Sequence, residues 1–108
     1  IGQAAAMEVI LTGEPIPAER AYNLGLVTRL AEPGKALDEA LTLAAKICEA
    51  APLAVWASRK VVLAAASADD DTLKRMTNEE FAGIMASEDT KEGLEAFIAK
   101  RTPNWKGR

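Results

Sequence analysis

The residues of this chain that could do chemistry are carboxylates, lysines and one thiol, because none of its 108 residues is a histidine. Histidine is the commonest general base, so a Ser-His or Cys-His mechanism is excluded for the residues given. The one cysteine, Cys48, lies among apolar helix-forming residues. We expect it to be a buried structural thiol, since a reactive thiolate needs positive neighbours or a histidine. A single cysteine allows no intrachain disulfide and favours a reducing compartment.

The two groups of neighbouring carboxylates favour structural roles. Glu79 and Glu80 are adjacent, so on a helix they diverge by about 100° and do not converge as a glycosidase pair does. Asp69, Asp70 and Asp71 precede a helical pattern and can cap its amino end. A calcium loop is the alternative, but the spaced oxygen ligands and the glycine of that motif are missing. The sequence therefore predicts no catalytic residue and no metal site here.

Basic residues gather near the carboxyl end. Residues 91–108 contain five Lys or Arg and two Glu, whereas the other residues contain eight basic and fourteen acidic side chains. Such a segment could meet a small polyanion or an acidic partner surface, or it could be a solvated tail. The net charge of −3 gives no overall attraction for nucleic acid, so no nucleic-acid partner is expected.

The composition is 49% hydrophobic and 27% charged, which is typical of a globular protein. No apolar run reaches the roughly 18 residues of a membrane span, and no secretory signal opens the sequence. We therefore expect a cytoplasmic protein that does not enter a membrane.

Helical periodicity runs through most of the chain. A first helix should end at Thr12-Gly13, and a second should run from Pro17 to Leu24 and stop at Gly25. We expect a brief strand-like or extended segment at 26–30, and helices from Gly34 onward. Pro52 should start one of these helices and Ser87 should cap the last, which ends at Thr102-Pro103. Apolar stripes on these helices should face a core; their residues are Leu37, Ala40, Leu41, Ala44, Ile47, Cys48, Leu73, Met76, Thr77, Phe81, Ile84, Met85, Leu94, Phe97 and Ile98.

Ordered motifs at both ends of the chain resemble one known family. The first is similar to the pattern LTG..I.A..A...GLV, with the residues Leu11-Thr12-Gly13, Ile16, Ala18, Ala21 and Gly25-Leu26-Val27. The last is similar to S.D..EG..AF..KR.P, with the residues Ser87, Asp89, Glu92-Gly93, Ala96-Phe97, Lys100-Arg101 and Pro103. Between them, Ala51-Pro52 and Lys60 resemble a further block. Both patterns are typical of the enoyl-CoA hydratase/isomerase (crotonase) family.

The resemblance implies a mainly α chain, the helical carboxyl-terminal region of a crotonase-like ββα spiral fold with at most one short strand. Residues 1–33 would form the trailing edge of the core, as helix, turn, helix and short strand. Residues 34–108 would form a helical trimerisation or lid region. The family's oxyanion donors and catalytic glutamates would precede Ile1, so a chain entered midway is expected to be inactive alone.

For the parent protein the resemblance implies an enoyl-CoA hydratase that adds water to trans-2-enoyl-CoA in fatty-acid or related acyl-CoA metabolism. The substrate would be an acyl-CoA, with no cofactor beyond the coenzyme A that it carries, and the assembly would be a homo-oligomer, a trimer or a dimer of trimers. Enoyl-CoA isomerase and acyl-CoA hydrolase activities are alternatives within the family. A non-enzymatic helical assembly module, exposing an apolar face to partners, is an alternative of another class.

Two residues match positions that contact ligand in the family. Lys100 resembles a lysine near the 3′-phosphate of coenzyme A, and Phe97 resembles an aromatic residue near the adenine or acyl pocket. A flexible ammonium suits a phosphate, and an aromatic face suits a purine. A solvated lysine and a core phenylalanine are the competing interpretations. Trp105 follows Pro103 in a short tail, and we expect it to pack on a neighbouring subunit.

Overall fold

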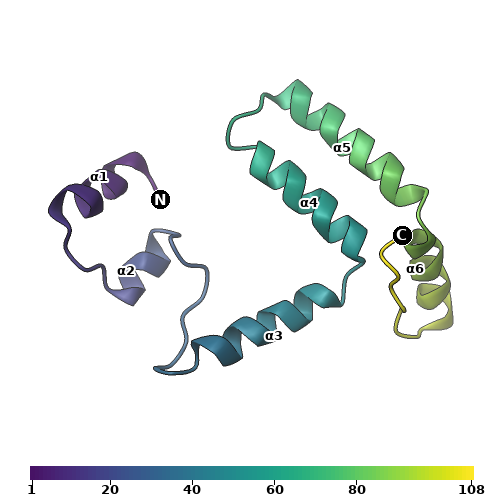
Figure 1. Ribbon diagram of the computed structural model, residues 1–108, viewed down its shortest axis with the longest axis horizontal. Helices are drawn as coiled ribbons and strands as arrows, with labels where there is room; N and C mark the ends of the chain where they lie inside the picture. Colours follow the sequence, from purple (N-terminus) through teal and green to yellow (C-terminus); the bar gives the residue numbers. More distant parts are fainter. The chain divides into compact units, whose positions relative to one another are not determined.

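A computed structural model describes all 108 residues of the chain and contains six α-helices and no strand. The helices divide between two compact units, residues Ile1–Thr42 and Leu43–Arg108, and the third helix begins in the first unit and ends in the second (Figure 1). No single helix is long and apolar enough to cross a membrane, and only the sharply bent pair α3 and α4 reaches that length and composition together. The helices are α1 (Gln3–Thr12), α2 (Ala18–Asn23), α3 (Ala36–Cys48), α4 (Pro52–Ala64), α5 (Asp70–Met85) and α6 (Glu88–Ala99).

In the first unit, one ion pair joins α1 to α2. Both Glu8 carboxylate oxygens accept from Nη2 of Arg20, at 2.8 Å each. Gly13 follows α1 in the left-handed region, at φ 66°, and its N–H donates to the Val9 carbonyl. That is the turn that the glycine was predicted to make.

The segment 26–30, for which a strand was one expectation, forms no strand. The Leu26 and Val27 amides instead donate to the Ala21 carbonyl, at 2.9 and 3.4 Å, and so finish the end of α2. A strand needs a neighbouring strand to satisfy its backbone groups, and no other segment of this chain is a strand.

In the second unit, α4 and α5 lie side by side and are joined by a short turn (Figure 1). Pro52 occupies the first turn of α4, as predicted. Asp69 caps α5, because its Oδ1 accepts the Thr72 N–H at 2.7 Å. Lys60 of α4 forms an ion pair with Glu80 of α5, and Ala57 is buried.

The prediction that the apolar stripes face a core is wrong for most of their residues in this chain. The only buried hydrophobic residues are Ala21, Ala57 and Ala96. Cys48, predicted to be buried, is exposed. Periodicity shows which side of a helix is apolar but does not supply the surface that covers it. Large side chains left exposed include Leu37, Leu41, Ile47, Phe81, Met85, Leu94, Phe97 and Ile98.

Candidate functional site

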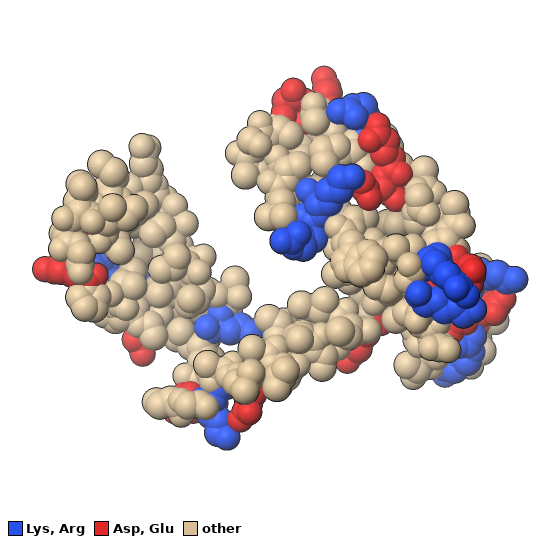
Figure 2. Space-filling model, in the orientation of Figure 1, with Lys and Arg blue, Asp and Glu red and all other residues tan.

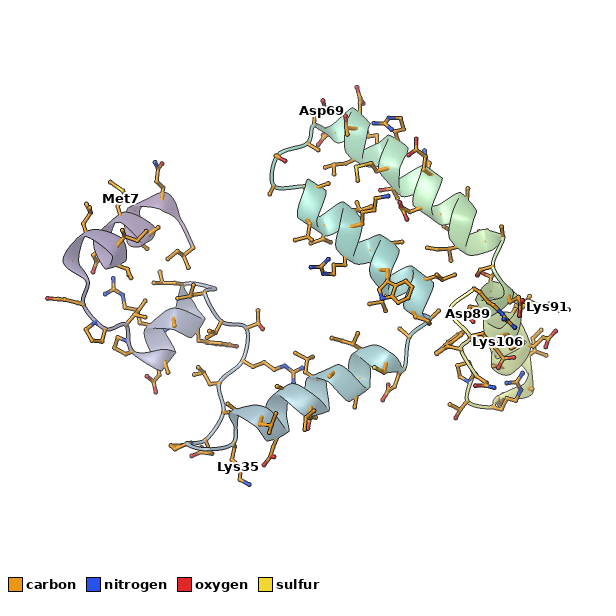
Figure 3. All side chains as sticks on the ribbon, viewed as in Figure 1. Met7, Lys35, Asp69, Asp89, Lys91 and Lys106 are labelled. Carbon is orange, nitrogen blue, oxygen red and sulfur yellow. The ribbon has the colours of Figure 1, made fainter.

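The last residues of the chain fold back on the amino end of α6. Ser87 caps this helix, its Oγ accepting the Thr90 N–H at 3.2 Å. Asp89 is only 2% exposed, and its two carboxylate oxygens accept the Lys106 and Gly107 N–H groups at 2.7 and 2.9 Å. Figure 3 shows Asp89 and Lys106 together beside α6. A buried carboxylate is tolerated because two backbone donors satisfy it.

The Arg108 carbonyl oxygen completes the same contact. It accepts the Glu88 N–H at 2.7 Å and the Asp89 N–H at 3.2 Å. These amides belong to the first turn of α6, where backbone N–H groups have no partner within the helix. Residues 105–108, which we call the C-terminal strap, therefore fill the amino end of α6.

Trp105 anchors the strap to two helices. Its Nε1–H donates to the Glu49 carbonyl at 3.0 Å, just beyond the end of α3. A Cβ atom built on Gly93 would lie 3.2 Å from Cη2 of the indole, so the ring packs directly on the α6 backbone. Trp105 thus packs within its own chain, because the strap turns back along its own helix; a contact of Trp105 with a neighbouring subunit stays a prediction. The sequence of the five residues after Pro103 does not by itself show that reversal.

Glu92, in the second turn of α6, accepts hydrogen bonds from two residues that follow the helix. Its carboxylate accepts two hydrogen bonds from Arg101, Nη1 to Oε1 at 2.6 Å and Nη2 to Oε2 at 2.9 Å. Its Oε1 also accepts the Asn104 N–H at 2.6 Å. The Arg101 guanidinium, with help from the Asn104 amide, lowers the pKa of Glu92 to about 2, and Glu92 in turn raises the pKa of Arg101. Bidentate pairs of this kind fix geometry as well as charge.

Lys100 immediately follows α6 and adopts a left-handed conformation, at φ 50° and ψ 42°. Its N–H donates to the Phe97 carbonyl at 3.3 Å, and the Arg101 N–H donates to the Ala96 carbonyl at 3.0 Å. Together these bonds make a Schellman motif. Lys100 is the only non-glycine residue of the chain with positive φ.

An open pocket of about 630 Å³ lies beside this turn, within the second unit. It is bounded by the end of α3, the residues after α6 and the strap. Lys100 is one of its lining residues, whereas Phe97 is not, and the Phe97 side chain is 82% exposed. The structure thus brings only one of the two predicted site residues to the pocket. The lining residues are Ala45, Cys48, Glu49, Lys100, Arg101, Thr102, Pro103 and Trp105.

Ion pairs occupy most of the basic side chains of residues 91–108. Arg101 pairs with Glu92, whereas Lys106 and Arg108 both pair with Glu88, at 3.3 Å each. The hydrogen bond from Lys106 and the charge of Arg108 lower the pKa of Glu88. Figure 2 shows basic and acidic side chains close together in the region of α6. Lys91 and Lys100 form no ion pair within this chain, and only Lys100 lines the pocket.

Sequence reasoning missed two residues that build this site, Asp89 and Glu92. Both belong to the carboxyl-terminal motif, but no role was predicted for either. Glu92 forms hydrogen bonds with Arg101, nine residues later. Residues on one helix face contact each other at a spacing of three or four, so a spacing of nine does not predict this contact. The contact exists only because α6 ends at Ala99. A signal was nevertheless present, since a Glu on α6 precedes a basic pair at the predicted helix end.

The model of the family described as enoyl-CoA hydratase/isomerase matches residues 1–108 of this chain. The chain belongs to the enoyl-CoA hydratase/isomerase family. Its curated relatives include the (E)-benzylidenesuccinyl-CoA hydratase of Thauera aromatica, 40% identical over 110 residues, which cover 99% of this chain and 42% of that protein. The 2,3-dehydroadipyl-CoA hydratase of Escherichia coli is 36% identical over 115 residues, which cover 100% of this chain and 42% of that protein.

Solved structures of the enoyl-CoA hydratase/isomerase family agree with the fold. The enoyl-CoA hydratase of Mycobacterium tuberculosis is 44% identical, with a TM-score of 0.93, and the match covers 100% of this chain and 43% of that one. The predicted family and the predicted mainly helical part of its fold are therefore confirmed. The chain spans less than half the length of the family members that it matches.

Proposed function

We propose that the protein to which this chain belongs is an enoyl-CoA hydratase. It would add water across the double bond of a trans-2-enoyl-CoA, with hydroxyl bonding to C3 and a proton to C2, in fatty-acid or related acyl-CoA metabolism. The observation that carries the proposal is the family match over residues 1–108, together with relatives that are named as CoA-ester hydratases. A cytoplasmic location fits such a metabolic role.

Within that protein, we assign to this chain the binding of substrate and none of the bond-making steps. Its adjacent glutamates are held by different cations, Glu79 by Arg75 at 3.1 Å and Glu80 by Lys60. The two carboxylates are therefore directed to different partners and do not form a converging pair. The isolated 108 residues should be inactive.

Lys100 is the proposed contact for the 3′-phosphate of coenzyme A. The support is its place at the pocket and the absence of an ion pair that would neutralise it within this chain. A point charge on a flexible stem suits a phosphate. Phe97 is the proposed contact for the adenine or acyl group, and its exposure leaves the ring face free for stacking.

A homo-oligomer, as a trimer or a dimer of trimers, is part of the proposal. Its support is the exposure of Leu94, Phe97 and Ile98 on one helix, since contiguous apolar surface of this kind marks protein contacts. The same residues favour a second candidate function, a non-enzymatic helical assembly module. The two candidates differ in activity: the module would not turn over any enoyl-CoA.

The test is to assay the full-length protein with trans-2-octenoyl-CoA, following loss of the absorbance of its conjugated unsaturated thioester. Hydration is expected, and absence of both hydration and double-bond migration would contradict the hydratase assignment and leave the assembly module. In the same protein, Lys100→Ala should raise KM about fivefold, the effect of losing one exposed charge contact. The kcat should stay within about twofold, because Lys100 contacts the coenzyme A part of the substrate and not the bond that reacts.

Lys91→Ala is the matched control, because Lys91 is the other lysine of α6 and its flanks without an ion pair. It does not line the pocket, so its KM should equal that of the unaltered protein. An unchanged KM in Lys100→Ala would refute the phosphate contact.

A further inference from the structure

Three helices of the chain end in a residue with left-handed backbone, and only α6 does so without glycine. Gly13 follows α1 at φ 66°, Gly25 follows α2 at φ 74°, and Lys100 follows α6 at φ 50°. A side chain in this region is strained by a clash that glycine, which has no Cβ, avoids. Such strain persists only where the surroundings hold the conformation firmly.

The hydrogen bonds of the turn itself do not distinguish α6 from α2. In α2 the Gly25 and Leu26 amides donate to the Tyr22 and Ala21 carbonyls at 3.0 and 2.9 Å. These bonds repeat the pattern at Lys100 and Arg101. A contact other than these hydrogen bonds must therefore hold Lys100 in the left-handed conformation that Gly25 adopts after α2.

Glu92 provides the contact that the turn after α6 has and the turn after α2 lacks. It lies two turns before the end of the helix, its side chain is only 18% exposed, and it takes both terminal nitrogens of Arg101. It also takes the Asn104 N–H. The residues on the far side of Lys100 are thus tied to the helix at two points. With Arg101 and Asn104 fixed, the backbone at Lys100 has little freedom to leave the left-handed region.

The same contacts determine which basic side chain of the pocket is left without an ion pair. Arg101 and Lys100 both line it, but the Glu92 carboxylate occupies both terminal nitrogens of the guanidinium. Lys100 keeps its charge without a partner in this chain. An anion entering the pocket would therefore meet one available ammonium beside a neutralised pair.

We propose that Glu92 is a positioning residue: by holding Arg101 and Asn104 it fixes the left-handed turn at Lys100 and presents that ammonium to a phosphate in the pocket. The proposal rests on the proposed function, in which Lys100 binds the 3′-phosphate of coenzyme A. A simple structural ion pair is the competing explanation. The two differ in whether the effect of Glu92 on binding passes through Lys100.

The experiment is a double-mutant cycle in the full-length protein, with dissociation constants measured by calorimetry for coenzyme A and for 3′-dephospho-coenzyme A. Glu92→Gln should weaken coenzyme A binding about threefold to fivefold and leave the dephospho form unchanged, since only the former carries the phosphate. Added to Lys100→Ala, the same substitution should cause no further loss, because the group that it positions is gone. Glu95→Gln, on the same helix and without an ion pair, is the control.

Arg101→Lys provides a second variant, because it keeps the charge but cannot form the two-point contact. It should weaken coenzyme A as Glu92→Gln does, and it decides the question if Glu92→Gln fails to fold. Equal losses for both ligands, or losses that add to those of Lys100→Ala, would overturn the positioning role. If Lys100→Ala itself leaves coenzyme A binding unchanged, the phosphate contact falls and this proposal with it. If the binding constants follow the expected pattern but the protein does not hydrate an enoyl-CoA, the hydratase reaction is refuted and the positioning role of Glu92 stands.

Discussion

The packing of Trp105 on Gly93 predicts opposite effects of the same substitution at two helical glycines. At Gly83 of α5 a new Cβ meets nothing within 4 Å, so Gly83→Ala should stabilise by about 0.5–1 kcal/mol through its helix propensity alone. At Gly93 the new Cβ would lie 3.2 and 3.3 Å from Cη2 and Cζ3 of the indole. Ordinary carbon contacts need about 3.5–4.0 Å, so the ring must retreat by a few tenths of an ångström.

The ring cannot retreat freely, because its Nε1–H is bonded to the Glu49 carbonyl at 3.0 Å. Overpacking against a held group costs roughly 1–3 kcal/mol, which exceeds the helix gain. We expect Gly93→Ala to lower the unfolding free energy by about 1 kcal/mol, so the two variants should differ by about 2 kcal/mol.

The assay is urea unfolding of the full-length protein, followed by tryptophan fluorescence in a Trp56→Phe background so that this chain reports through Trp105. Gly83→Ala should raise the midpoint, and Gly93→Ala should lower it and shift the emission of the displaced indole. In a Trp105→Leu background, with unfolding followed by circular dichroism because the reporter indole is gone, Gly93→Ala should cost much less than it does beside Trp105. If Gly93→Ala stabilises as much as Gly83→Ala, the indole does not pack on α6 as described.

Three further predictions concern carboxylates. Asp89→Asn should reduce hydrogen-exchange protection of the Gly107 amide by about tenfold to hundredfold, because a charge-assisted bond of roughly 1.5–3 kcal/mol is lost. The pKa of Glu92, about 2, lies below its ordinary value of 4.5. The stability that comes from its pair with Arg101 is therefore fully present above pH 4.5 and is lost as the pH falls toward 2. Glu92→Gln should remove that part of the acid dependence of the urea midpoint. Asp69→Ala should lower the midpoint, since the cap of α5 is lost.

Each of these substitutions has a control in the same chain. Asp71→Asn removes a first-turn carboxylate whose side chain is almost fully exposed, and the Gly107 amide should not respond to it. Glu95→Gln should leave the acid dependence intact, and Asp70→Ala should spare the cap. Equal effects of a substitution and its control would contradict the contact concerned.

Features set by local chemistry could be predicted from the sequence. The caps at Asp69 and Ser87, the start of α4 at Pro52 and the turn at Gly13 all form as expected. Each of them depends on residues within one turn of the position predicted. Burial could not be predicted in the same way, because Cys48 and the apolar stripes need a covering surface that periodicity does not provide.

The candidate site was predictable only in part. Lys100 came from a resemblance of motifs, and the structure adds its place at the pocket and its strained backbone. Glu92 and Asp89 act across the end of α6, on partners nine and more residues away. Their contacts depend on where the chain reverses, which no periodic pattern records. The same reversal explains why Trp105 packs within its own chain.

The strap also determines how mechanical load would pass through this part of the molecule. Five hydrogen bonds join residues 106–108 to Glu88 and Asp89. A pulling force applied at Arg108 would therefore enter α6 at its amino end, bypassing the turn at Lys100 until those bonds part. A tether or fluorophore attached at Arg108 would report on the start of α6, although 20 residues of sequence separate the two points.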